Sequence, residues 1–153
     1  MRYLPIGLDV RGRICIVVGG GRIGTRKAIN LLGAGAAVTV VSPEATEEIS
    51  DLARRGKLRW ENRAAREEDL EGAFLAVIAS DSEELNARLV LSAKDRGILV
   101  CDASSADRTQ VIFGALHRSP TATLAVFTDG EDPGLARTTR DRIAELEPEW
   151  EKK

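Results

Sequence analysis

The sequence VVGGGRIGTRKA, residues 17–28, constrains the fold more than any other stretch of this chain. It lies between a β-branched run and an amphipathic segment, and its glycines have a Gly-x-Gly-x-x-Gly spacing. At a strand–helix junction Gly19 permits a tight turn, Gly21 lets the backbone approach a pyrophosphate, and Gly24 lets the helix pack close to the strand. The N–H groups that open the helix then face the phosphates. The spacing therefore predicts a dinucleotide-binding βαβ unit.

Strand and helix patterns alternate over about two thirds of the chain. The expected strands cover residues 13–18, 37–41, 58–61, 73–80 and 98–101. The expected helices are 22–34, a segment opened by Ser42 and Pro43 and closed by Gly56, and a segment that starts at Asp81 and Glu84 and ends at Gly97. Apolar strands that alternate with helices indicate a parallel sheet covered on both faces. Right-handed crossovers make it an α/β, Rossmann-like, doubly wound sheet.

The pattern changes after this alternation ends. TATLAVFT, residues 121–128, predicts a longer strand, and an Asp-Pro pair predicts a helix over 132–146 that Pro148 stops. We therefore expect an NAD-binding Rossmann-like domain over residues 1–113. A short β/α dimerisation and substrate-side segment follows over residues 114–153.

Composition limits the partners of the chain. Its 22 basic and 24 acidic residues nearly cancel, which argues against nucleic acid as a partner. Cys15 and Cys101 lie in apolar runs. We therefore expect both to be small core residues with free thiols, in a protein from a reducing compartment. The chain has one histidine and no CxxC pair, which argues against a metal site built from its own side chains. Its N-terminus has no long apolar stretch, so we expect no signal peptide or membrane anchor and a cytoplasmic location.

The end of the second expected strand bears on the choice of cofactor. An acid usually binds the adenosine ribose there, and this chain has Ser42, Pro43 and Glu44. No Arg or Lys stands at that position to bind a 2′-phosphate, so the sequence favours NAD over NADP. Glu44 is a candidate for the ribose contact, and its alternative role is that of a first-turn acid complementing a helix dipole.

Several motifs along the chain together resemble the precorrin-2 dehydrogenase family, the NAD-dependent module of siroheme synthase. They are YLPIGLDVRGR, VVGGGRIGTRKA, EDLEGAFLAVIASDSEELN, IFGALHRSP and TDGEDPGLARTTRDRI. The resemblance implies oxidation of precorrin-2, a tetrapyrrole, to sirohydrochlorin with NAD as hydride acceptor. It also implies a homodimer, and some members of the family insert ferrous iron into the product.

The resemblance also implies positions for the cofactor contacts. They fall on Arg22 and Ile23 in the glycine loop and on Pro43 and Glu44 after the second strand. Ser80 and Asp81 follow the fourth expected strand, at the carboxyl edge where open α/β sheets bind ligands.

The stretch after the fifth expected strand departs from the family. Members usually have Asn-Val-Val-Asp there, and the matching residues 101–104 place Ser104 at the position of the acid. Asp102 lies two residues earlier on the same side of an extended chain, displaced by about 6–7 Å. A serine cannot act as a carboxylate base, so we expect iron insertion to be absent. Asp102 is then the candidate that handles a proton and Ser104 an orienting group, or Asp102 is a turn acid.

A second departure is the acidic loop ahead of the last expected helix. Asp129, Glu131 and Asp132 should disfavour a substrate rich in carboxylates, although Asp132 also suits a helix N-cap. The candidate substrate contacts are Thr128, Arg137 and Arg140. The alternative for the two arginines is a solvated helix face that pairs with neighbouring acids.

Three hypotheses follow from these features. The first is an NAD-dependent dehydrogenase acting on precorrin-2 without iron insertion, and the second keeps both activities with Asp102 in place of the missing acid. The third is a catalytically silent NAD-binding sensor or scaffold. Bifunctional relatives continue into a helical region that helps close the substrate cleft, whereas this chain stops at Lys153. We therefore expect either a dimer partner that completes the cleft or a shortened form.

Overall fold

The computed structural model describes residues 2–146. It divides into two compact units. The larger unit is Gly7–Val111, and the smaller one combines the N-terminal residues up to Ile6 with the chain from Ile112 onward. The proposed domains, 1–113 and 114–153, remain a prediction about which part of the chain carries which function.

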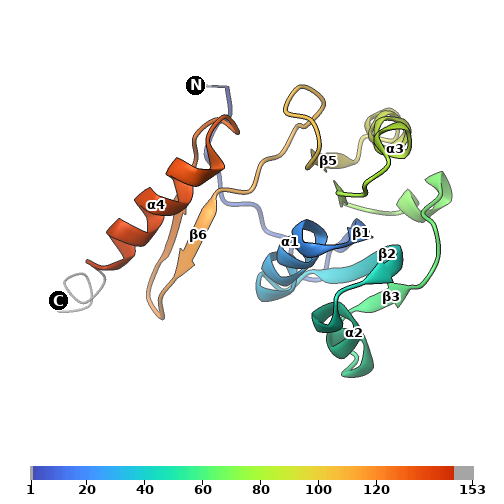
Figure 1. The fold of residues 1–153 in the computed structure, drawn as a ribbon, viewed down its shortest axis with the longest axis horizontal. Helices are drawn as coiled ribbons and strands as arrows, with labels where there is room; N and C mark the ends of the chain where they lie inside the picture. The colour runs from blue at the N-terminus through green and yellow to red at the C-terminus, as the bar shows by residue number, and fades with distance from the viewer. Residues whose placement is uncertain (1, 147–153) are drawn as a thin grey trace. The chain divides into compact units, whose positions relative to one another are not determined.

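The larger unit is built around one parallel sheet (Figure 1). Its elements are β1 Ile14–Gly20, α1 Arg22–Gly33, β2 Ala37–Ala45, α2 Glu47–Arg54, β3 Arg59–Glu61, the 3-10 helix η1 Glu67–Leu70, β4 Leu75–Ile78, α3 Glu83–Asp95 and β5 Leu99–Asp102. The strand order is β3-β2-β1-β4-β5, and every pair is parallel. The order reverses between β1 and β4, which is the switch point of a doubly wound sheet. The predicted Rossmann-like α/β fold is confirmed.

Alternate residues of the strands pack against helices on opposite faces. Ile16 and Val18 of β1 share a buried cluster with Leu89 of α3. Val17, between them in sequence, faces Gly24 of α1. Because successive side chains of a strand point to opposite faces, this sheet is covered on both sides. The carboxyl ends of its strands remain the accessible edge.

Two predicted helix starts are wrong. Ser42 and Pro43 do not open a helix, because β2 continues to Ala45 and Ala45 pairs with Gly20 of the glycine loop. The N-cap of α2 is Thr46, whose Oγ1 accepts the Ile49 N–H at 3.4 Å. Asp81 does not cap α3 either.

The N-cap of α3 is Ser82, one residue after the predicted position. Its hydroxyl accepts the Leu85 N–H at 3.3 Å. Asp81 therefore stays outside the helix, on the loop at the carboxyl end of β4. The predicted end of this helix is confirmed, because α3 stops at Asp95 and Gly97 has a φ of 69°.

Both cysteines lie in the core, as predicted. Cys15 on β1 and Cys101 on β5 are free thiols with exposed fractions of 0% and 3%. Burial raises the pKa of Cys15 to about 11. Burial also raises the pKa of Cys101, although the Lys27 amine lies 3.7 Å from its sulfur. These thiols therefore serve packing.

The smaller unit is a β-hairpin with one helix. Strands β6 Ala115–Arg118 and β7 Thr123–Val126 pair antiparallel, and α4 spans Pro133–Ala144. The strand predicted over 121–128 is thus shorter than expected, and β6 was not predicted. Asp132 caps α4 as predicted, since its Oδ1 accepts the Leu135 N–H at 2.8 Å. The predicted stop at Pro148 lies outside the described residues.

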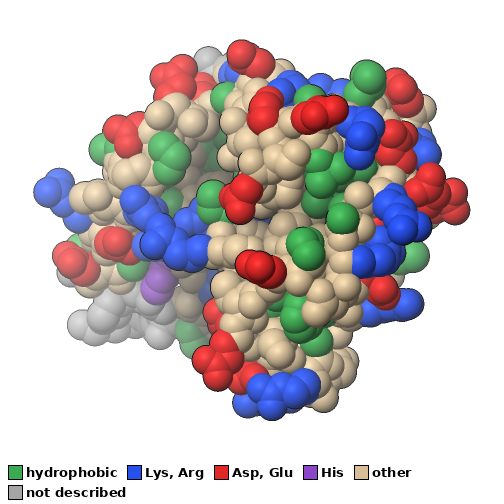
Figure 2. All heavy atoms as spheres, turned by 45° about the vertical axis from the view of Figure 1, so that its right-hand side comes forward, with side chains coloured by type: hydrophobic (Ala, Val, Ile, Leu, Met, Phe, Trp, Pro, Cys, Tyr) green, Lys and Arg blue, Asp and Glu red, His purple; other side chains and the backbone are tan. Residues whose placement is uncertain are grey.

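The surface carries both signs of charge. Figure 2 shows basic and acidic side chains intermixed over one face, in keeping with the net charge of −2. Within residues 2–146, none of the helices combines the length and apolar composition that crossing a bilayer requires.

Candidate functional site

A groove of about 490 Å³ lies at the carboxyl ends of β1, β2 and β4. Parallel sheets of this type bind ligands at this edge. Six residues predicted as cofactor contacts line it together: Gly19, Gly21, Pro43, Glu44, Ser80 and Asp81. Arg22 lines a neighbouring groove instead, and Ile23 is 47% exposed and lines neither.

The glycine loop has no room for side chains at two of its three predicted positions. A Cβ added at Gly19, whose φ is 103°, would lie 2.3 Å from the Ala79 carbonyl oxygen. A Cβ at Gly24 would lie 1.9 Å from the Gly19 carbonyl oxygen, so α1 packs directly on the loop. At Gly21 no atom lies within 4 Å of such a Cβ. Gly21 therefore leaves open space beside the groove, where a pyrophosphate can approach the backbone.

Gly20 is a requirement that the motif does not predict. It occupies an unspecified position of the Gly-x-Gly-x-x-Gly pattern, yet a Cβ there would lie 2.4 Å from the Glu44 carbonyl oxygen. The cause is the extension of β2, which pairs Ala45 with Gly20. The three consecutive glycines in the sequence were the one indication of this requirement. The extension of β2 to Ala45 explains why the middle one must be glycine.

Two threonines, also missed from sequence, fasten the glycine loop to the start of α2. The hydroxyls of Thr25 and Thr46 are 2.8 Å apart, and Thr25 also donates to the Gly21 carbonyl at 2.9 Å. The Thr46 N–H donates to the Gly20 carbonyl at 3.0 Å. These hydrogen bonds fix the position of the glycine loop relative to the end of β2.

The N-terminus of α1 is suited to an anion. Its N-cap is Gly21, which supplies no side-chain cap, and the first turn contains no acidic residue. The free N–H groups and the positive end of the helix dipole therefore remain available to a phosphate group. Glu44 lines the same groove and is exposed, so its carboxylate can accept hydrogen bonds from hydroxyl groups of a ligand.

Asp102 is the last residue of β5 and its carboxylate is completely buried. Arg108 donates to one oxygen through Nε at 2.8 Å. Ser104 donates to the other through its backbone N–H at 2.9 Å and its hydroxyl at 2.6 Å. Burial raises the pKa of Asp102, but the bonds from Ser104 and Arg108 outweigh burial and hold that pKa below its usual value. Such a carboxylate is a poor proton acceptor.

This arrangement favours the turn-acid interpretation of Asp102 over a catalytic one. Ser104 donates two hydrogen bonds to Asp102, and its orienting role in the reaction stays a prediction. The acid that ends the fifth strand is Asp102 itself, and Ser104 lies two residues beyond β5.

A buried asparagine connects this turn to the cofactor groove. Asn86 on α3 is 1% exposed and donates to the Ser80 carbonyl at 2.8 Å and to the Ser104 hydroxyl at 3.3 Å. Its Oδ1 accepts the Ser80 hydroxyl at 2.6 Å. Arg108 also pairs with Glu83 at the start of α3. The network was not predicted, because its members come from three separate segments.

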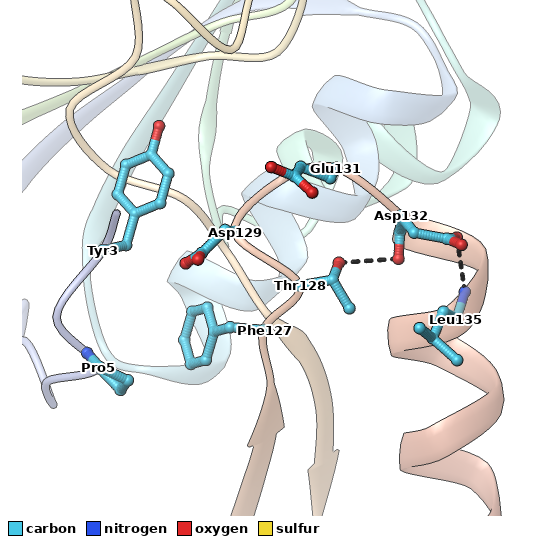
Figure 3. Close-up of a pocket in the computed structure, with 8 residues that line it drawn as sticks. All are labelled: Tyr3, Pro5, Phe127, Thr128, Asp129, Glu131, Asp132 and Leu135. Carbon is cyan, nitrogen blue, oxygen red and sulfur yellow. Dashed lines mark hydrogen bonds between the residues drawn. The ribbon is translucent and has the colours of Figure 1, made fainter. Parts of the chain in front are cut away.

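The candidate substrate residues belong to the smaller unit. Thr128 lines a pocket of about 460 Å³, where Figure 3 shows the acids Asp129, Glu131 and Asp132 along the loop between β7 and α4. The Thr128 hydroxyl donates to the Asp132 carbonyl at 2.8 Å.

The two candidate arginines of α4 differ. Arg140 donates to the Leu116 carbonyl at 3.0 Å and pairs with Asp141 at 2.6 Å, as its alternative interpretation expects. Arg137 is exposed and has no ion pair with any residue in the described part of the chain. Arg137 is therefore the one of the two that is available to a ligand.

The parallel sheet, its switch point and the glycine loop together define an NAD(P)-binding Rossmann-type protein. The NAD(P)-binding family model matches residues 6–115. The solved structure of SirC, a precorrin-2 dehydrogenase, superposes with a TM-score of 0.81 and 32% identity, covering 94% of this chain and 70% of that one. The chain belongs to the precorrin-2 dehydrogenase family.

The curated relatives of this chain include siroheme synthases from several bacteria. The protein from Chromobacterium violaceum is 41% identical over 149 residues, which is 97% of this chain and 32% of the relative. The protein from Methylococcus capsulatus is 42% identical over 144 residues, 94% of this chain and 30% of the relative. The chain spans about a third of the length of the curated relatives that it matches.

Proposed function

We propose that this chain oxidises precorrin-2 to sirohydrochlorin with NAD. The observation that carries the proposal is the groove at the switch point, in a chain that shares its fold over 94% of its length with SirC, a precorrin-2 dehydrogenase. Bound NAD supplies the chemistry of accepting a hydride, two electrons and a proton from a C–H bond, while a second proton leaves the substrate. The protein's own part is to bind and orient.

Each part of the groove has a proposed task. The N–H groups at Gly21 and the first turn of α1 bind the pyrophosphate, and Arg22 and Ile23 contribute to this site as the first two residues of that turn. Glu44 accepts hydrogen bonds from the ribose, and Pro43 forms the wall next to it. Ser80 and Asp81 lie where the nucleotide crosses the end of β4. The hydrogen bond between Thr25 and Thr46 holds the glycine loop against the end of β2.

We further propose that iron insertion is absent. Metal insertion must remove pyrrole protons, and Asp102 has both carboxylate oxygens occupied. Asp102 is then a positioning residue that holds the end of β5. The bifunctional alternative requires Arg108 to release this carboxylate.

We propose that the protein works as a homodimer in the cytoplasm. Leu4, Ile6 and Leu135 are 73%, 70% and 56% exposed, and all three belong to the smaller unit. Large apolar side chains that face solvent in this number suit an interface between subunits. Arg137 is the proposed contact to a carboxylate of the tetrapyrrole.

The test is anaerobic incubation of the protein with fresh precorrin-2 and NAD, following NADH formation and the sirohydrochlorin spectrum. Turnover is the expected result. NAD binding by calorimetry without turnover would overturn the proposal in favour of a silent module.

The Asp102→Asn variant tests the positioning role in the same assay. A positioning role predicts a partial loss of kcat with the shape of the pH–rate profile preserved. Loss of the acidic limb of that profile would make Asp102 the proton acceptor, because a base is inactivated when it is protonated. Ferrous iron added to the product tests insertion, and metal uptake above the rate without protein would contradict its absence.

A further inference from the structure

A second groove, of about 300 Å³, lies between α1 and α2. Arg22 and Arg26 line it, and because they are four residues apart they project from the same face of α1. Thr46 and Asn30 add polar groups, and Glu48 is its acid. The two arginines and one glutamate leave this lining with a net positive charge. The groove therefore offers guanidinium and hydroxyl groups, which are suited to a phosphate.

Neither arginine is used by the fold. Among residues 2–146, the side chains of Arg22 and Arg26 have no hydrogen-bond or ion-pair partner, and both residues are exposed. Like charges four residues apart on a helix repel each other by a few tenths of a kcal/mol. An anion bound between them would remove that repulsion, so the arrangement favours a bound phosphate over an empty groove.

The second groove continues from the nucleotide groove. Thr46 lines both, directly after the end of β2. In folds of this type the adenosine ribose lies at the end of the second strand, and an arginine nearby accommodates a 2′-phosphate. A phosphate on the ribose 2′-oxygen would thus extend past Thr46 toward Arg22 and Arg26.

We infer that the groove between α1 and α2 binds the adenosine 2′-phosphate, so that the protein accepts NADP in addition to NAD. The inference rests on the proposed nucleotide site. The residues directly after β2 include no arginine or lysine that could bind a 2′-phosphate. The two arginines proposed here come from α1 instead. Glu44 on the lip of the nucleotide groove opposes a phosphate, which is why NAD remains a cofactor.

The test compares two probes by calorimetry, 5′-AMP and adenosine 2′,5′-bisphosphate, which differ only by the 2′-phosphate. We expect the bisphosphate to bind about tenfold more tightly, equivalent to about 1.4 kcal/mol. Arg26→Gln should reduce this ratio toward one, and Glu48→Gln should increase it. The matched control is Arg55→Gln, which removes an equal charge from an exposed position at the C-cap of α2 outside the groove, and should leave the ratio as in the wild type.

Each outcome separates this inference from the proposed function. Equal binding of the two probes would overturn the 2′-phosphate site and leave the NAD site standing. Failure of both probes to bind would overturn the nucleotide site itself. Inorganic phosphate that binds in an Arg26-dependent manner while the two probes bind equally would mark a free-anion site, which also overturns the inference. Turnover with NADP that falls in Arg26→Gln more than turnover with NAD would support it.

Discussion

The two units of this protein bury their apolar residues to very different extents. All four residues of β4 in the larger unit are buried, whereas none of β7 in the smaller unit is. Among the described residues of the smaller unit, Ala136 is the one apolar residue that is buried. The larger unit thus has a core of its own, whereas most apolar side chains of the smaller unit are half-buried or exposed. The difference teaches that the proposed cofactor groove belongs to a unit with a closed core, whereas the proposed substrate residues belong to a unit whose apolar side chains stay partly exposed.

The largest effect is expected from the glycine loop of the larger unit. Gly24→Ala places a Cβ 1.9 Å from a backbone carbonyl that cannot move away cheaply, so we expect loss of 3 kcal/mol or more, roughly the upper range for overpacking. Gly21→Ala is the matched control, because its Cβ meets open space. It should cost about 1 kcal/mol or less as an N-cap change. Urea unfolding measures both, and equal losses would contradict the packing of α1 on the loop.

The next effect compares the two cores directly. Leu75→Ala on β4 removes a side chain that is 1% exposed and should cost about 2–5 kcal/mol. Leu124→Ala on β7 removes a half-buried side chain and should cost about 1 kcal/mol. Urea midpoints of the two variants provide the comparison. A loss at Leu124 as large as that at Leu75 would show that the smaller unit has a covered core.

A third prediction concerns the buried ion pair of Asp102. Arg108→Gln leaves this carboxylate buried without a cation, and we expect a loss of about 2 kcal/mol near neutral pH, less than for a fully buried pair because the Arg108 side chain is 29% exposed. Arg11→Gln breaks the pair with Asp9, where both side chains are largely exposed and screened by water, and should leave the urea midpoint close to that of the wild type. Losses of the same size from the two variants would contradict the assignment.

The same pair makes stability depend on pH. The folded pKa of Asp102 lies below its unfolded value, so its contribution is complete above about pH 4 and is lost as the pH falls through the folded pKa. Unfolding of the wild type and of Asp102→Asn should therefore converge as the pH falls below about 4. A difference that stays constant over that range would exclude an ionised Asp102.

The smallest effects come from helix caps, one in each unit. Ser82→Ala on α3 and Asp132→Ala on α4 each remove one side-chain acceptor and should cost about 1 kcal/mol locally. In the larger unit the loss should appear in global unfolding. In the smaller unit it should appear as faster hydrogen exchange in α4 alone. Faster exchange in α3 alone after Ser82→Ala would break the proposed contrast.

Hydrophobic periodicity predicted the sheet well, because its signal is local. The run 73–80 is apolar since both faces of β4 are covered, and the glycine spacing marks the first strand–helix junction. The helix start at Ser42 was wrong because pairing with Gly20, more than twenty residues away, keeps β2 extended to Ala45. Local capping preferences cannot express such a pairing.

The polar network around Asp102 could not be predicted for a similar reason. Arg108 contacts Glu83 across 25 residues, and Asn86 contacts Ser104 across 18. The sequence does not indicate which buried group a charged residue will pair with when the two are far apart along the chain. The C-terminal half-buried strands were also difficult, since β6 has an apolar pattern too weak to distinguish from a loop.

The two buried cysteines have a consequence for measuring motion. Cys15 sits on β1 in the centre of the sheet, and Cys101 sits on β5 at its edge. The thiolate is the form that attacks a thiol reagent, and burial disfavours it at both positions. Labelling therefore requires the strand to open first. The labelling rate of Cys101 then counts openings of the edge, and that of Cys15 counts openings of the centre. The wild-type chain thus carries two natural probes of local opening. If Cys101 is labelled faster than Cys15, the edge strand β5 detaches without opening of the central strand β1.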